Sequence, residues 1–345
     1  MSITHIFLDF IPSIYLGAPD DENFLSILPG HRFLLKGKAH EALSITLYGC
    51  LAGVVISLVM TPIFTFFLPT LFKSITFFIP YILIFSSLYL IFTENEFIIS
   101  LVIFLLAGFL GIATFHLPIQ QPLLPLLSGL FGSSALIVSL KQKTKIPNQK
   151  ITPLKTISMP KLDFIKSFFA SLIAAPLCSF LPGIGSSQAA ILGSQFFRQN
   201  DKTFLFIVGA VNIIVMSLSF VTAYAIGKTR TGSAVAVTQL LSKILPEHLI
   251  VLLITIIIAS AIAFILAILF SKLFTRIVNK IDYTYLTVIV LGILLIVNIV
   301  FTNWIGLIVL STATALGIFC ILSKSRRINL MGCLLIPSIL YYLIA

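Results

Sequence analysis

A polar interruption inside an apolar run is the feature of this sequence best suited to binding chemistry. Phe168 to Leu181 and Ala189 to Phe197 are apolar, and helix-breaking and polar residues lie between them: Pro182, Gly183, Gly185, Ser186, Ser187 and Gln188. A helix break in hydrocarbon exposes unpaired backbone groups, so it persists only inside protein or beside a water-filled cavity. A helix N-terminus at such a break attracts anions. We therefore predict a substrate site here, with a plain surface loop as the alternative.

Two further breaks carry charged side chains. The break at residues 227–233 is basic and could hold an anion, or it could be a positively charged cytoplasmic loop. The break at residues 17–23 is acidic and could bind a coupling cation, or it could cap the next helix. The charged residues are Lys228 and Arg230 in the basic break and Asp20, Asp21 and Glu22 in the acidic one.

A carboxylate also lies within the first apolar segment. Asp9 follows His5 by four residues, so the two side chains share one face of a helix. Ionisable residues inside membrane segments are functional candidates by default. Asp9 therefore joins the acidic break as a candidate ligand for a coupling ion.

The composition identifies the chain as a multi-pass protein of the cell membrane. Hydrophobic residues make up 59% of the chain and charged residues only 10%, whereas about 25% of a soluble domain is charged. The net charge of +11 would suggest a nucleic-acid partner in a soluble protein. Here the Lys and Arg residues gather in short loops between apolar runs, as the positive-inside rule expects. Nucleic-acid binding and a soluble scaffold role are therefore excluded.

The apolar runs predict an all-α protein with about 9–11 membrane segments, some of them broken or re-entrant. Each regular run is long enough to cross the hydrocarbon core. A basic stretch at residues 141–163, with six Lys and a lone Asp, predicts the main cytoplasmic linker. The regular spans are Ala42 to Phe67, Ile75 to Phe92, Phe97 to Leu117, Leu123 to Leu140, Phe204 to Ile226, Leu249 to Phe274, Tyr285 to Thr302, Ile305 to Leu322 and Leu330 to Ala345.

The order of breaks and spans repeats at an offset of about 205 to 210 residues, with Gly111-Ile falling near Gly317-Ile. The loop at residues 116–121 has no Lys or Arg, whereas its counterpart at residues 324–327 is strongly basic. Opposite charge bias in equivalent loops predicts two inverted repeats, a common plan of transporters. We expect a first membrane repeat at residues 1–140, lacking a counterpart of the Pro-Gly hairpin, and a second repeat at residues 164–345.

Several motifs resemble those of the large membrane subunit of the tripartite tricarboxylate transporter family (TctA), in its archaeal stand-alone form. They are His5-Ile-Phe-Leu-Asp-Phe-Ile-Pro-Ser, Leu16-Gly-Ala-Pro-Asp-Asp-Glu, Ile27-Leu-Pro-Gly-His-Arg, Gly129-Leu-Phe-Gly, Phe180-Leu-Pro-Gly-Ile-Gly-Ser-Ser-Gln-Ala-Ala-Ile-Leu, Ala225-Ile-Gly-Lys-Thr-Arg-Thr-Gly and Arg326-Arg-Ile-Asn-Leu-Met-Gly. The resemblance implies a permease that takes up an organic anion, a di- or tricarboxylate, with Na⁺ or H⁺ as coupling ion and no other cofactor. It implies function without the periplasmic binding protein of the bacterial systems, and it leaves a homodimer open.

Two other functions compete with this prediction. A lipid-phosphate translocase for polyprenyl phosphate would use the same basic side chains and backbone N–H groups to hold its phosphate. A membrane enzyme is the weakest reading, because the sequence has no His/Glu metal cluster, no paired intramembrane Asp motif and no nucleophile with a nearby base. We therefore expect no catalytic residues and no metal ligands.

Overall fold

The computed structural model describes residues 1–15, 27–92, 94, 96–141, 147–157, 159–180, 190, 200–229, 231–241, 244–280 and 283–344, and these contain helices but no strand. The prediction of an all-α membrane protein is confirmed. The α-helices are α1 Ser2–Tyr15, α2 Ile27–Leu35, α3 Ala39–Phe92, α4 Phe97–His116, α5 Leu123–Leu127, α6 Ser134–Lys141, α7 Lys161–Phe180, α9 Asp201–Ile226, α10 Gly232–Leu241, α11 Pro246–Val278, α12 Tyr283–Leu322 and α13 Gly332–Ile344. A π-helix, η2 Ser128–Ser133, and two 3₁₀ helices, η3 Leu154–Thr156 and η4 Arg327–Met331, complete the set.

Seven helices within the described ranges are long and apolar enough to cross a membrane, and two shorter apolar helices accompany them. These helices agree with the predicted multi-pass arrangement. The seven are Ala39–Thr70, Phe97–His116, Leu123–Lys141, Asp201–Ile226, Pro246–Val278, Thr284–Leu322 and Arg327–Ile344, and the shorter two are Pro80–Tyr89 and Gly232–Leu241.

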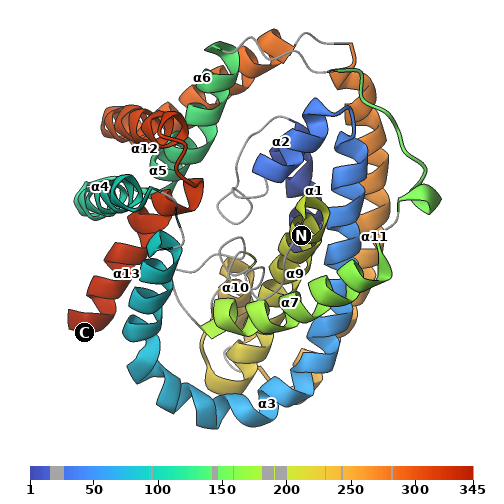
Figure 1. Cartoon of the computed structure of the whole chain (residues 1–345). Helices are drawn as coiled ribbons and strands as arrows, with labels where there is room; N and C mark the ends of the chain where they lie inside the picture. Colours follow the sequence, from blue (N-terminus) through green and yellow to red (C-terminus); the bar gives the residue numbers. More distant parts are fainter. Residues whose placement is uncertain are drawn as a thin grey trace.

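Helix α3 joins two of the predicted spans into one element of 54 residues. A boundary was predicted between Phe67 and Ile75, but the helix continues through it with Pro62, Pro69 and Pro80 inside. Proline removes a backbone hydrogen bond and kinks a helix without having to end it. Figure 1 shows the result, a long arc of α3 from the α11 side of the molecule towards α13.

Helix α12 is two helices separated by a sharp kink. Asn303 has φ 56° and ψ −165°, far from helical values. Asparagine tolerates positive φ better than most residues with a Cβ. The kink falls between the predicted spans that end at Thr302 and begin at Ile305, so this predicted boundary is confirmed.

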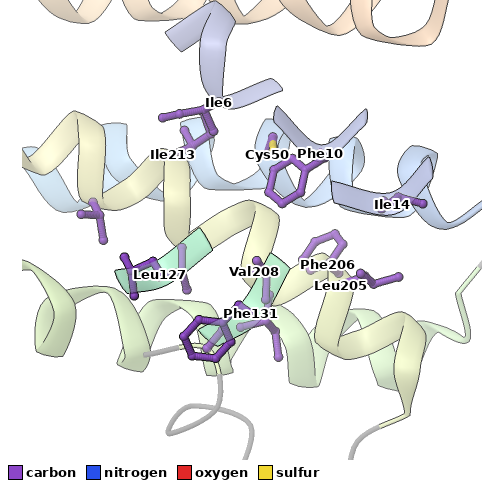
Figure 2. Packing of buried hydrophobic residues seen from close by; sticks show 14 of the residues in the cluster. Ile6, Phe10, Ile14, Cys50, Leu127, Phe131, Leu205, Phe206, Val208 and Ile213 are labelled. Carbon is purple, nitrogen blue, oxygen red and sulfur yellow. The ribbon is translucent and has the colours of Figure 1, made fainter. Parts of the chain in front are cut away.

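Helix α9 forms the centre of the core. Its side chains are buried continuously from Leu205 to Ala223, and its main partner is α3. Glycines permit a close approach, because a Cβ at Gly49 would meet the carbonyl of Phe206 and one at Gly209 would meet that of Thr46. Figure 2 shows Phe206 among the buried side chains of this cluster, together with residues of α1, α3 and η2.

Helices from the two halves of the chain pack on each other throughout. Helix α1 packs against α11 and α3 against α9, while α4 contacts α13 and α12 contacts α5, η2 and α6. Figure 1 shows α4, α12 and α13 gathered on the side opposite α11. Residues 1–140 and 164–345 therefore share one core, and the inverted orientation of the two repeats stays a prediction.

The described part of the basic linker is anchored to the helices through Gln149. Gln149 is buried, and its side chain accepts a hydrogen bond from the Ala39 N–H at 3.1 Å and donates one to the Leu34 carbonyl at 2.8 Å. Its backbone N–H donates to the side chain of Asn279 at 2.6 Å. The linker therefore joins α2, α3 and the end of α11.

Candidate functional site

Most of the predicted site lies outside the described residues. This holds for the whole Pro-Gly hairpin, for the acidic break and for one cation of the basic break. The residues are Pro182, Gly183, Gly185, Ser186, Ser187, Gln188, Asp20, Asp21, Glu22 and Arg230. The structure does describe Lys228, Asp9 and the helices around them.

The basic break is held against the buried face of α9 by hydroxyl groups. Helix α9 ends at Gly227, which adopts the left-handed conformation at φ 68°. Four residues later the backbone N–H and the hydroxyl of Thr231 both donate to the Ser219 hydroxyl at 3.0 Å. Thr231 also accepts the Ala234 N–H at 3.4 Å, so it caps the start of α10.

Lys228 lies in this tethered turn with an exposed side chain. The turn thus combines a cation with the hydroxyl of Ser219, which is only 2% exposed, at a position where a helix is interrupted. Cations and hydroxyl donors at a helix interruption are the groups that bind carboxylates in transporters.

Asp9 pairs with His5 across one helical turn, as the spacing predicted. The Nδ1 atom of His5 lies 2.7 Å from the Asp9 Oδ2, and the Asp9 side chain is 15% exposed. The Ser13 hydroxyl donates to the Asp9 carbonyl at 2.9 Å. Asp9 is therefore a half-buried carboxylate that already has a partner, and a coupling ion there would share it with the imidazole.

A buried polar cluster that the sequence analysis missed joins α1, α3 and α11. The Tyr15 hydroxyl lies 2.7 Å from the Thr275 hydroxyl and 3.1 Å from that of Ser271. The Nδ1 atom of His40 lies 2.6 Å from the same Ser271 hydroxyl, and its Nε2 atom is buried without a partner among the described residues. Hydroxyl groups are common in apolar helices, so the cluster has no sequence signal beyond His40 itself.

Arg327 is a buried cation, and the sequence analysis assigned it to a basic loop. Its side chain is 5% exposed, and Nη2 donates to the carbonyls of Leu130 (3.3 Å) and Phe131 and to the Ser134 hydroxyl (3.2 Å). Its guanidinium carbon lies 5.4 Å from the centre of the Phe131 ring. The Nε atom is buried without a partner, and no carboxylate in the described part of the chain forms an ion pair with Arg327.

The neighbouring arginine has the opposite environment. Arg326 is 57% exposed on its side chain and lies 3.5 Å from the Glu94 carboxylate, which is 8% exposed. Burial raises the pKa of Glu94, and the attraction of Arg326 and a hydrogen bond from Asn329 offset part of that rise. In the sequence, the one signal that distinguishes Arg327 from Arg326 is that Arg327 directly precedes the apolar run.

The chain matches the profile of a family described as "Tripartite tricarboxylate transporter TctA family" over residues 1–332. It is 34% identical to "Uncharacterized protein MJ1079" of Methanocaldococcus jannaschii, in an alignment that covers 99% of this chain and 86% of that protein. No solved structure matches the chain.

Proposed function

Because the chain belongs to the tripartite tricarboxylate transporter TctA family, we propose that it is a secondary active transporter for a di- or tricarboxylate anion. The observation that carries the proposal is the family match over residues 1–332, together with seven apolar helices long enough to span a membrane within the described ranges. The family is one of transporters, which agrees with the prediction of no enzymatic activity. It gives no support to a lipid-phosphate translocase.

The proposed substrate site lies at helix interruptions near α9. Lys228 would attract one carboxylate group, and the hydroxyls of Thr231 and Ser219 would donate or relay hydrogen bonds at the same turn. Arg230 and the hairpin from Pro182 to Gln188 are the other proposed parts of the site. A charge-assisted hydrogen bond contributes roughly twice as much as a neutral one, so Lys228 is the group among the described residues whose loss should weaken binding most.

The proposed coupling ion is Na⁺ or H⁺. Asp9 is the described candidate, because its carboxylate is 15% exposed and close to His5. Asp20, Asp21 and Glu22 are the other candidates. We further propose that the protein works without a periplasmic binding protein, as a monomer or a homodimer.

Uptake by purified protein in liposomes tests the function directly. Labelled citrate, a tricarboxylate, or labelled succinate, a dicarboxylate, is offered outside, with an inward Na⁺ gradient or an inward proton gradient imposed separately. Accumulation under one gradient and not the other supports the proposal and identifies the ion. Absence of accumulation of both anions under both gradients contradicts it.

A matched pair of lysine variants tests the site. Lys228→Ala should lower uptake about tenfold, the loss expected from one hydrogen bond to a charged group. Lys280→Ala is the control, because Lys280 is another exposed lysine in a turn that follows a long helix. Equal effects of the two variants would mean that Lys228 serves membrane orientation and not binding.

A further inference from the structure

A groove of about 600 Å³ runs along the outside of the helix bundle between α3 and α7. Tyr48, Ala52 and Val55 of α3 form one wall, at the spacing of a single helical face. Phe164 and Ile165 of α7 form the other wall. Figure 1 shows α7 lying beside α3 and α9.

Both walls carry exposed apolar side chains. Helix α3 lies in a membrane span at this position, and Val55 is 56% exposed. On α7, Phe164 is 45% and Ile165 50% exposed, and the exposed apolar face continues at Phe169. In a soluble protein such a surface would mark an interaction site. Within a bilayer the hydrocarbon chains of lipids meet it, so a lipid chain is the occupant that the groove fits.

One end of the groove is positively charged. Lys161 is the charged residue among those that line it, and it lies where the basic linker joins α7. Lys150 and Lys155 are exposed on the same linker, and no described carboxylate forms an ion pair with Lys161. An apolar groove that ends at a lysine is complementary in shape and charge to a lipid with a negatively charged head group.

We propose that a single anionic, phosphate-headed lipid binds in this groove, with its chain between α3 and α7 and its head group at Lys161. The lipid stays bound and fills the space above Phe206 of α9, which forms the floor of the groove. This site shares no residue with the proposed substrate site and does not depend on the transported solute.

A second groove provides an internal control. It measures about 450 Å³, lies between α4 and α13, and is also apolar. Its lining residues include His116, Leu340 and Tyr341 but no Lys or Arg. If hydrocarbon alone decided lipid binding, both grooves would hold lipid without preference for the head group.

Native mass spectrometry of the full chain in detergent can measure binding of added phosphatidylglycerol and phosphatidylcholine with matched chains. We expect one phosphatidylglycerol to bind at least fivefold more tightly than phosphatidylcholine, which corresponds to about 1 kcal/mol for one lysine near a lipid phosphate. Lys161→Gln should abolish that preference, and Lys161→Glu should lower phosphatidylglycerol binding further. Val55→Trp should fill the groove and weaken binding of both lipids.

The control variant is Leu340→Trp, which fills the second groove and should leave the preference unchanged. Unfolding temperatures in lipid-free detergent identify any variant that is misfolded, and Lys161→Gln removes only an exposed charge. Equal binding of the two lipids by the unmodified protein would overturn the proposal. An effect of Leu340→Trp as large as that of Val55→Trp would overturn it as well.

Discussion

Two close helix crossings on the same side of the molecule are built alike but differ in one cation. In the first, Gly111 of α4 lies against the carbonyl of Cys333, and Gly332 lies against the carbonyl of Phe104. In the second, Gly317 of α12 lies against the carbonyl of Leu130, and Gly129 lies against that of Leu310. Gly317 follows Gly111 by 206 residues, which is the offset of the predicted repeat.

The two crossings differ in that the second contains the π-helix η2 and the side chain of Arg327 that binds it. In the second crossing the partner of α12 is η2, whose Leu130 and Phe131 carbonyls accept Nη2 of Arg327. Arg327 opens η4, the segment that leads into Gly332 of the first crossing. A hydrogen bond between the Ser100 and Ser325 hydroxyls accompanies the first crossing, whereas the second is also held by a buried charge that reaches it from the first. Single-turn π-helices are frequent at functional sites, which makes η2 a candidate functional element of the second crossing.

The largest expected effect is the loss of a glycine from either crossing. A Cβ at Gly111 or at Gly317 would meet backbone atoms of the partner helix, so Gly111→Ala and Gly317→Ala should each lower the free energy of unfolding by about 2–3 kcal/mol. Gly292→Ala is the control, because nothing lies within 4 Å of a Cβ there, and it should be neutral or stabilising. Unfolding in mixed detergent micelles measures all three. A destabilising Gly292→Ala would contradict this explanation, because it would show that the loss of a glycine destabilises the protein even without a close crossing.

Replacement of Arg327 should affect the second crossing and thereby distinguish it from the first. Arg327→Met removes a donor from two carbonyls and one hydroxyl, and we expect a loss of about 1–2 kcal/mol. Arg327→Lys should cost at least as much, since it keeps the buried charge but loses the planar guanidinium. The same unfolding assay checks both. Wild-type stability of Arg327→Lys would mean that charge alone, and not the fork of donors, holds η2.

A double-mutant cycle tests whether Arg327 is coupled to the second crossing and not to the first. Gly317 and Arg327 both contact the Leu130 carbonyl, so Arg327→Met and Gly317→Ala should couple by about 0.5–1 kcal/mol. The cycle of Arg327→Met with Gly111→Ala shares no partner atom and should be additive within the error of the measurement. Coupling of equal size in the two cycles would show that Arg327 supports both crossings alike.

These residues also show how far the sequence could be interpreted. The kink at Asn303 was predictable, because a polar residue interrupts two apolar runs of spanning length. The continuity of α3 was not, because a proline is compatible both with a bend inside a helix and with the end of a helix, and the sequence does not distinguish the two. Arg327 was assigned to a basic loop because it forms one charge cluster with Lys324 and Arg326 in the sequence. The structure leaves those two exposed, and the burial of Arg327 alone depends on the tertiary position of η2. The pair of His5 and Asp9 was predictable because it is local.

The smallest expected effect concerns pH at the Glu94 end of the first crossing. Burial raises the pKa of Glu94 in the folded protein above the ordinary value of about 4.3, so the folded state favours the protonated carboxyl. The contribution of Glu94 to the free energy of unfolding is fully present at pH values below the ordinary pKa. It is lost as the pH rises through the raised pKa of the folded state. Glu94→Gln should therefore become more stable relative to the unmodified protein as the pH increases across this window, measured as the difference in unfolding temperature. A difference that shrinks with rising pH would mean that the attraction between Glu94 and Arg326 outweighs burial, and that the exposed arginine, like the buried one, holds its crossing by charge.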